Sequence, residues 1–577
     1  MKSSSRRKQT VIPFVIVTAG VLLSCITAVF GYDILPDYQD KLFHLRRLAA
    51  LAQTLKSGYF PARIYFVMNE GTGYAMPVFY PDLFLYIPAC LVNAGVPLGI
   101  AYEIYVVIIN AITAITTYLS VKGILKGNRY ISAVISFVYV LSVYRLTDVY
   151  IRDAAGEYTA MAFLPFVVYS FIRVYREEGR EDGNEKDYTG MLKNAACLGL
   201  SMALLALTHV LTTMMAAGFL ILCALFLVRR SFRKYELLTL LFSVLFFLGL
   251  SACYLYPMMD YMLSDRYLVN TSSDIMRGFY PGLCDIFEAI PSGSGSGIVY
   301  ELKMSTAVGP AITAVLLSFF TAGFIRIKRK AHFPKEQIFL FGVMVLSLFM
   351  SSRYFPWNGI EKIGGPVRAL LFKVQFSWRY LGIATVCGCI LGGLLIEDIY
   401  KLSIRPGHMM TLLIMILAII PAVILQVRAC SENRHVRINS GEEIGIVSDE
   451  LYYPVSWIRD AAYDEEPACT GCEVVSYARY GGDWIVDVRY DSAPSVLVFP
   501  VVYYKGYRAQ ATGGEKLQTV QASDGRVMVL IPEGFSGELK MGFKEPLSWR
   551  IAELISLISA VAVIWVLNLR KRGGSSH

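Results

Sequence analysis

Long apolar stretches recur along the 577-residue chain, and short polar connections separate them. Most stretches have about 18–22 residues without a charge, which is enough for a helix to cross roughly 30 Å of hydrocarbon. The pattern predicts a mostly α protein, a polytopic bundle of about 12 membrane spans, at 11–31, 99–121, 129–146, 157–175, 190–207, 210–228, 236–257, 305–325, 337–352, 379–398, 409–427 and 548–569.

The pattern changes from about residue 440, where short apolar and aromatic runs are broken by Gly, Asp and Pro. Such runs are typical of strands and predict a β-rich, sandwich-like domain of about 100 residues. The clearest runs are Trp484–Val488, Ser495–Tyr504 and Val527–Pro532. We therefore divide the chain into a transmembrane domain, a β-rich domain, and a final span with its tail, at 1–427, 428–547 and 548–577.

Composition and charge fit a membrane protein: 55% of the residues are hydrophobic and 17% are charged, against roughly a quarter charged in soluble domains. The net charge of +9 does not indicate nucleic acid, because Lys and Arg gather in every second connection. The positive-inside rule makes those connections cytoplasmic, with both termini inside and 428–547 outside. This alternation requires that 79–96, which contains three prolines, does not cross.

Eleven cysteines do not form a framework, since most fall in apolar segments. Cys469 and Cys472 form one CxxC outside the membrane, which is weak for zinc and favours a local disulfide or two free thiols. The sequence indicates no cofactor and does not support a divalent cation.

The first polar cluster follows the first span and contains Asp33, Asp37 and Asp40. From Asp40 to Lys56 the apolar residues recur every three or four positions, which predicts an amphipathic helix at the outer interface. Asp40, His44 and Arg47 share one face of it and could deprotonate a hydroxyl and hold a phosphate. The alternative is a solvated polar face, with Asp40 serving the helix dipole.

The second cluster, between two spans, includes Arg145, Arg152 and Glu157 at the predicted outer mouth of the bundle. Ionisable groups at membrane depth are candidates for function. Equally, Glu157 could be a first-turn acid of the next helix, with both arginines reaching toward lipid headgroups.

The third cluster precedes the predicted span 379–398 and contains Arg379 within a basic and aromatic run. Its external basic residues oppose the positive-inside trend, which favours a specific anionic ligand over an ordinary aromatic belt. His209 lies where two short spans meet outside, and a lone histidine there is more often structural.

Motifs of soluble enzymes are absent: the sequence has no Walker loop, no GxGxxG opening a βα unit, no HExxH and no serine-nucleophile elbow. A nucleotide-driven pump is therefore excluded. Because sugar nucleotides are cytoplasmic and the polar clusters face outward, a transferase here would need a donor carried across the membrane on lipid.

Several short segments resemble the GT-C superfamily of polyprenyl-phosphate-sugar glycosyltransferases. Within it they are most similar to bacterial multi-spanning proteins labelled "6-pyruvoyl-tetrahydropterin synthase-related" and to membrane proteins that glycosylate teichoic acids. The segments are Asp40–Arg47 with Gly58–Arg63, Tyr144–Glu157 with Phe163–Pro165, Gln375–Arg379, Phe499–Tyr507 and Ile531–Gly534.

The resemblance implies a GT-C-like fold in a bacterial cell membrane. It also implies an inverting, usually metal-free transfer from a polyprenyl-phosphate-linked sugar donor to an extracytoplasmic envelope acceptor, a glycan or teichoic acid. By this resemblance Asp40 is the general base, with Asp33 and Asp37 as rivals. His44 and Glu157 are further catalytic candidates. Candidates for substrate binding are Asp33, Asp37, Arg47, Arg145, Arg152, His209 and Arg379.

Two other classes stay open. A transporter of lipid-linked glycans would need charges deep inside the spans, and mid-span positions are nearly free of them. A non-catalytic membrane scaffold of envelope assembly would share the same pattern.

Overall fold

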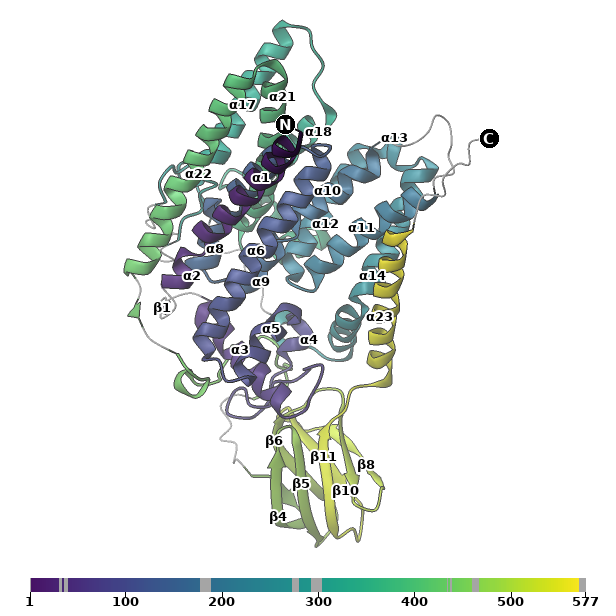
Figure 1. The fold of residues 1–577 in the computed structure, drawn as a ribbon. Coiled ribbons are helices and arrows are strands. Elements are labelled where there is room, and N and C mark those ends of the chain that lie inside the picture. Colours follow the sequence, from purple (N-terminus) through teal and green to yellow (C-terminus); the bar gives the residue numbers. More distant parts are fainter. Residues whose placement is uncertain are drawn as a thin grey trace.

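A computed structural model describes residues 2–30, 34–35, 40–176, 188–271, 280–291, 304–432, 434–435, 438–458 and 466–569. A helical bundle makes up most of the protein, and a small β domain hangs from one end of it (Figure 1). The predicted fold class, a polytopic helical bundle with a C-terminal β-rich domain, is confirmed.

The helices are α1 (Lys2–Ser24), α2 (Ile26–Phe30), α3 (Lys41–Lys56), α4 (Met76–Phe79), α5 (Tyr86–Asn93), α6 (Leu98–Ile124), α7 (Arg129–Val140), α8 (Val143–Tyr150), α9 (Ala155–Met161), α10 (Leu164–Tyr175), α11 (Tyr188–Ala206), α12 (Val210–Phe226), α13 (Val228–Ser231), α14 (Lys234–Ser264), α15 (Leu268–Thr271), α16 (Leu283–Ile286), α17 (Pro310–Lys328), α18 (Lys335–Ser351), α19 (Trp357–Ile363), α20 (Gly365–Phe372), α21 (Tyr380–Leu402), α22 (Ile404–Glu432) and α23 (Leu547–Asn568). Short 3-10 turns occur at Leu83–Leu85, Ser377–Arg379 and Glu442–Ile444.

Among the described residues, eight helical segments are long and apolar enough to cross a membrane, and the bent pair α7 and α8 makes a possible ninth. The predicted number of 12 is therefore only approximate. Each of the twelve predicted segments overlaps a helix, but three correspond to shorter helices: the apolar part of α1, Thr10–Ser24, and the 17-residue helices α12 and α18. Apolar composition alone does not separate a spanning helix from a shorter one, which explains the difference.

Helix α3 begins and ends where its periodicity predicts, but it does not lie exposed at an interface. Its polar His44 and Arg47 are each only 1% exposed, and its apolar Leu45, Leu48 and Leu51 are 0% exposed. It packs against α5 and α6, and Arg46 donates to the carbonyl oxygen of Ile444 at 2.9 Å. Protein therefore covers the helix on both its apolar and its polar side, and the expectation of a solvated face is wrong for these two side chains.

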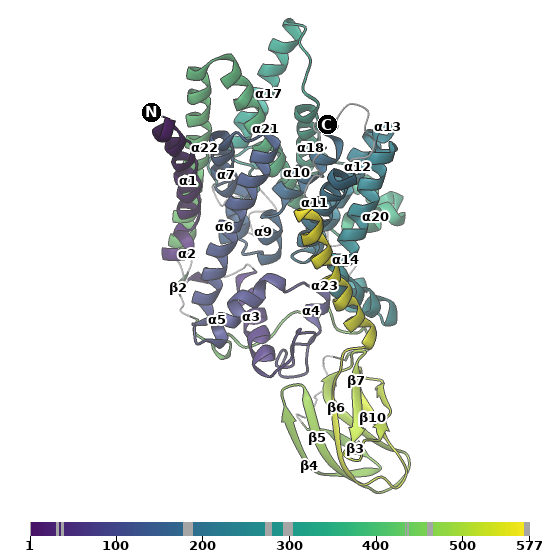
Figure 2. The ribbon, with the colours of Figure 1, turned by 45° about the vertical axis from the view of Figure 1, so that its right-hand side comes forward.

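Small residues let helices of the bundle approach closely. A Cβ at Gly199 of α11 would lie 2.8 Å from the backbone oxygen of Ser243 on α14. A Cβ at Gly249 of α14 would lie 2.3 Å from the hydroxyl oxygen of Ser559 on α23. Close approach of this kind is how helices gain packing energy where lipid supplies no hydrophobic drive. It holds the last helix against the bundle, as both side views show (Figures 1 and 2).

The β domain is a sandwich of a four-stranded sheet, β3-β6-β10-β9, and a five-stranded sheet, β4-β5-β11-β7-β8, all antiparallel. Its strands are β3 (Ala468–Thr470), β4 (Cys472–Tyr480), β5 (Asp483–Tyr490), β6 (Ser495–Val502), β7 (Tyr507–Ala511), β8 (Lys516–Leu517), β9 (Thr519–Gln521), β10 (Arg526–Ile531) and β11 (Gly537–Phe543). A further short pair joins β1 (Ile34–Leu35) to β2 (Arg434–His435).

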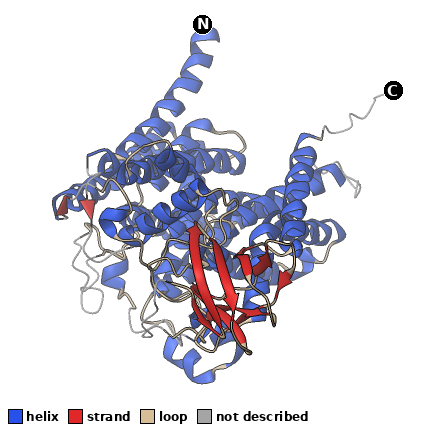
Figure 3. Cartoon of the chain, turned by 90° about the horizontal axis from the view of Figure 1, so that it is seen from below, coloured by secondary structure: helices blue, strands red, loops and turns tan. Residues whose placement is uncertain are grey.

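The sandwich core follows the period of two that places alternate side chains on one face of a strand. Trp484, Val486 and Val488 of β5 are buried, and so are Val527 and Val529 of β10. In the view from below, the strands of the sandwich lie in front of the helices (Figure 3). Cys469 and Cys472 are free thiols in this domain.

The β domain is fixed to the bundle through the loop between α3 and α4. Arg479 donates to the carbonyl oxygens of Phe66 at 2.9 Å and Gly71 at 2.7 Å. The amide of Val502 donates to Thr72 at 2.9 Å. These contacts place the domain at the end of the bundle that carries α3, α4 and α5 (Figures 1 and 2).

Candidate functional site

The second and third polar clusters of the sequence meet in one buried network around Glu157. Arg152 donates to Glu157 Oε2 at 2.7 Å, and Arg379 Nε lies 3.0 Å from the same oxygen. The hydroxyl of Tyr144 donates to Glu157 Oε1 at 2.7 Å. Arg152 also donates to Asp148 Oδ1 at 2.9 Å, so one guanidinium nitrogen joins two carboxylates. Glu157 does lie in the first turn of α9, but it also pairs with two arginines, Arg152 and Arg379, which are far apart from each other in the sequence.

Neither Arg145 nor Arg152 reaches toward lipid headgroups, because they are 0% and 5% exposed. Arg145 lies apart from the network. It donates to the hydroxyl of Thr113 on α6 at 2.9 Å, and its Nε has no hydrogen-bond partner within the described residues. The structure thus brings together Arg152, Glu157 and Arg379, and not Arg145.

Asp40 joins this network through the backbone. Its amide donates to the carbonyl oxygen of Arg152 at 3.0 Å, which holds the start of α3 beside the 151–154 loop. Asp40 is the N-cap residue of α3, yet its side chain makes no capping hydrogen bond and is exposed. Its carboxylate is close enough to act on the charge of Arg152. The side chain of an N-cap residue usually accepts a hydrogen bond from a free backbone amide in the first turn of the helix. The Asp40 carboxylate does not do so.

His44 packs one turn further along α3, against the start of α9. Its Nε2 accepts the amide hydrogen of Ala155 at 3.2 Å, so Nδ1 carries the ring proton, and within the described residues it has no partner. Burial and the nearby Arg47 hold the pKa of His44 well below its usual value. The imidazole is therefore neutral.

The guanidinium of Arg47 makes its hydrogen bonds to the neighbouring turn 80–82. Its Nε donates to Asp82 Oδ1 at 2.7 Å, and its Nη2 donates to the carbonyl oxygens of Tyr80 at 3.0 Å and Pro81 at 2.6 Å. Its guanidinium also lies 4.0 Å from the centre of the Tyr80 ring. The sequence did not point to Asp82, and only the folded chain pairs it with Arg47.

His209, at the start of α12, packs against the Tyr80 ring. Its ring lies 6.0 Å from that of Tyr80, edge to face, and its Nδ1 is 2.8 Å from the hydroxyl of Thr212. Gly156 fits between them: a Cβ there would lie 2.3 Å from the Tyr80 hydroxyl and 3.2 Å from His209 Cδ2. Tyr80 thus links the Arg47 pair with the Glu157 network.

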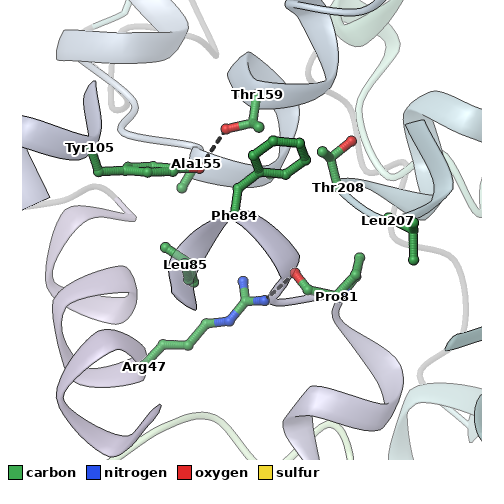
Figure 4. A pocket seen from close by; sticks show the side chains of 10 residues that line it. Arg47, Pro81, Phe84, Leu85, Tyr105, Ala155, Thr159, Leu207 and Thr208 are labelled. Carbon is green, nitrogen blue, oxygen red and sulfur yellow. Dashed lines mark hydrogen bonds between the residues drawn. The ribbon is translucent and has the colours of Figure 1, made fainter. Parts of the chain in front are cut away.

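A small pocket opens beside these groups (Figure 4). Its lining comes from five parts of the chain and includes Arg47, Phe84, Tyr105, Thr159 and Thr208. The hydroxyls of Tyr105 and Thr159 lie 2.5 Å apart on its wall. The pocket lies against Gly156, next to the charged network, rather than among the charges themselves.

Asp148, Tyr144 and Asp153 are additional site residues. Asp148 Oδ2 is buried and has no hydrogen-bond partner among the described residues. Burial raises the pKa of Asp153 to about 7, although Lys41 nearby acts against the rise. Asp148 and Tyr144 lie in the second sequence cluster, so their proximity in sequence was the available signal. Asp33 and Asp37 lie outside the described residues.

Arg379 donates through Nη1 to Val374 at 3.1 Å, and its Nη2 makes no hydrogen bond to the part of the chain that the structure describes. In that same part, no group of three or more His, Cys, Asp or Glu side chains could hold a metal ion.

No protein-family model matches the chain, and no curated protein matches its sequence. Among the solved structures that are similar to it are two membrane proteins. One is the archaeal oligosaccharyltransferase AglB from Archaeoglobus fulgidus, in complex with an inhibitory peptide and a dolichol-phosphate, with a TM-score of 0.43 and 10% identity over 72% of this chain and 56% of that one. The other is the arabinofuranosyltransferase AftD from Mycobacteria, with a TM-score of 0.35 and 14% identity over 72% of this chain and 26% of that one. This chain therefore spans about half of the first and a quarter of the second.

Proposed function

We propose that this protein is a GT-C-type membrane glycosyltransferase that moves a sugar from a polyprenyl-phosphate carrier to an acceptor in the cell envelope, a glycan or teichoic acid. The observation that carries the proposal is the convergence of Asp40, Arg152 with Glu157, and Arg379. These residues come from three of the segments that resemble that superfamily: Arg152 and Arg379 both pair with Glu157, and the amide of Asp40 is bonded to the carbonyl oxygen of Arg152.

In this proposal Asp40 is the general base. The acceptor hydroxyl oxygen attacks the anomeric carbon of the donor sugar, and the bond from that carbon to the phosphate oxygen breaks. The hydroxyl proton passes to the Asp40 carboxylate, and the polyprenyl phosphate leaves as an anion. Asp40 suits the role because its carboxylate is exposed and makes no capping bond. A positioned base typically gives about 10²–10⁴-fold in rate.

Arg379, together with Arg152, would stabilise the charge that develops on the leaving phosphate. Arg379 suits it because its Nη2 makes no hydrogen bond within the described residues, while its Nη1 donates to the carbonyl oxygen of Val374 and its Nε lies 3.0 Å from Glu157. A guanidinium fixed on one edge can present its remaining donors to a phosphate without reorganising. Glu157 is then a positioning residue, and His44 orients the start of α9 through Ala155.

Arg47 and His209 support the site from behind, since Arg47 holds the Tyr80–Asp82 turn and His209 packs on Tyr80. We assign the polyprenyl chain to the lipid side of the bundle and the acceptor to the side of the β domain. No cofactor is needed for this chemistry.

A transfer assay tests the proposal. Purified full-length protein in lipid nanodiscs is given polyprenyl-phosphate sugar and envelope acceptor, and transfer of labelled sugar is measured. Turnover by the purified wild type, lost on Asp40→Asn, supports the enzyme. If membranes from a strain lacking the protein lose envelope glycosylation, while the purified protein shows no turnover with any donor, the protein is a scaffold or a transporter.

A further inference from the structure

A second pocket lies at the junction between the loop after α3 and the point where the β domain passes into α23. Its cavity of about 170 Å³ far exceeds the roughly 10–15 Å³ that one water needs. It is lined by Tyr59, Phe60, Arg63, Phe543, Glu545 and Arg550, among others. None of these residues belongs to the network around Glu157.

Glu545 brings an unsatisfied acceptor to this pocket. Its side chain is only 6% exposed. Its Oε1 accepts from Arg63 Nε at 3.4 Å, while its Oε2 is buried without a hydrogen bond, the nearest guanidinium nitrogen of Arg550 being 3.6 Å away. A buried acceptor without a partner is costly, so a ligand that donates a hydrogen bond is favoured here.

The charges of the pocket disfavour a phosphate or another anion. Arg63 is paired with both Glu545 and Glu553, the second at 2.7 Å. Arg550 is paired with Glu553 at 3.0 Å. The cations are therefore already neutralised, and an anion would face the free oxygen of Glu545. Uncharged hydroxyl groups, which both donate and accept, match this wall better.

Aromatic rings also line the pocket. Phe60 is 72% exposed and packs edge to face on Tyr86 with ring centres 5.7 Å apart. Tyr59 packs on Phe66 at 4.6 Å. An exposed ring beside a few converging polar groups suits a ligand with one apolar face and several hydroxyls, which is the chemistry of a sugar ring.

We propose that this pocket binds one sugar unit of the acceptor glycan, remote from the transfer site. The inference rests on the proposed function for the identity of the glycan. Asp40 lies at the start of α3 and the pocket loop at its end, and a helix of 16 residues rises about 24 Å. Only an acceptor of several sugar units reaches both places, so the pocket selects long acceptors.

The test measures glycan binding without donor, so that it does not depend on transfer. Full-length protein in nanodiscs is titrated with fluorescently labelled short and long oligosaccharides released from the envelope glycan of the host. Glu545→Gln and Phe60→Ala should each weaken binding of the long fragments by roughly tenfold or more, because the first replaces an accepting carboxylate oxygen by an NH2 donor and the second removes an aromatic ring. Short fragments cannot occupy both places at once, so they should bind the wild type more weakly than long fragments do, and the variants should change their binding less.

Controls are matched for chemistry and exposure. Glu473→Gln changes a carboxylate on the exposed face of β4, and Phe232→Ala removes a ring that is also 72% exposed but lies beyond α13. Both should bind as the wild type does. Phe60→Ala removes an exposed ring and leaves the fold intact even if Glu545→Gln disturbs Arg63.

Unchanged binding of long fragments in the stable Phe60→Ala and Glu545→Gln proteins would overturn the inference. So would displacement of the probe by inorganic phosphate or by phosphatidylglycerol vesicles, which would make the pocket a headgroup site. If the pocket variants lose glycan binding but the wild type never transfers sugar, the pocket stands and the proposed function fails.

Discussion

The carboxylate of Glu157 lies 3.0 Å from Nε of Arg379, although the two residues come from different helices far apart in the sequence. The same oxygen accepts from Arg152 at 2.7 Å, so one acid holds two guanidinium groups in a buried site. Two arginines drawn together in this way would repel each other without the acid between them. The consequences of this pairing can be measured.

Arg379 should be needed for use of the lipid donor. Arg379→Ala removes the donors aimed at the leaving phosphate, and we expect transfer to fall by about 10²-fold or more, since loss of one such group typically costs that much. Arg379→Lys should recover only part, because an ammonium lacks the two-pronged donor geometry. Transfer rates at rising donor concentration measure both. Equal donor dependence in the wild type and both variants would remove Arg379 from the site.

Asp40 should be the acid on which turnover depends. Asp40→Asn keeps the size of the side chain but cannot accept a proton, so the protein should insert and fold normally while transfer falls by about 10²-fold or more. Asp33→Asn and Asp37→Asn remove the same charge from the same loop and serve as controls. A dead control beside an active Asp40→Asn protein would assign the base to that neighbour. Activity in all three would exclude the loop.

Arg47 should act on stability. Arg47→Met leaves the buried Asp82 without its cation, and breaking a buried pair in this way typically costs about 3–5 kcal/mol. Thermal unfolding in detergent should show a clear loss, partly recovered in the double variant with Asp82→Asn. Arg489→Met, in an exposed pair with Glu473, should change little. A stable but inactive Arg47→Met protein would instead indicate that Arg47 binds substrate.

The buried, neutral His44 should make the fold sensitive to acid. Its folded pKa lies below the ordinary value of 6.5, so below that pH the unfolded chain binds a proton that the folded chain does not. Stability then falls with decreasing pH, by about 1.4 kcal/mol for each pH unit at most. We expect the wild type to lose more stability between pH 7.5 and 5 than His44→Gln, measured by thermal unfolding. His408→Gln, at an exposed position, should follow the wild type.

The β domain should lie outside the cell and the turn after α17 inside. In a background where the exposed and half-buried cysteines (Cys90, Cys253, Cys284, Cys430, Cys469 and Cys472) are replaced by Ser, a reporter cysteine is introduced at Ser523 or Ala331. A membrane-impermeant reagent should label the first in intact cells and the second only after permeabilisation. The opposite pattern would turn the proposed site toward the cytoplasm.

The sequence alone determined the elements, because these depend on local periodicity and charge. Apolar runs fixed where the helices lie, and the three- and four-residue spacing from Asp40 to Lys56 predicted α3 to within a residue. Alternating runs predicted the sandwich, whose strands β5, β6 and β10 match the segments expected to within two residues. Composition could not separate a full span from the 17-residue α12, since both are equally apolar.

Only the tertiary structure decided which polar residues share a site. The sequence grouped Arg145 with Arg152 and Asp40 with Arg47 because they are neighbours along the chain. Folding separates them: Arg145 turns to Thr113 and Arg47 to Asp82, while Arg152 and Arg379 meet on Glu157. Helical spacing defines the direction of a side chain on its own helix. Its partner depends on how distant helices pack, and no local pattern records that.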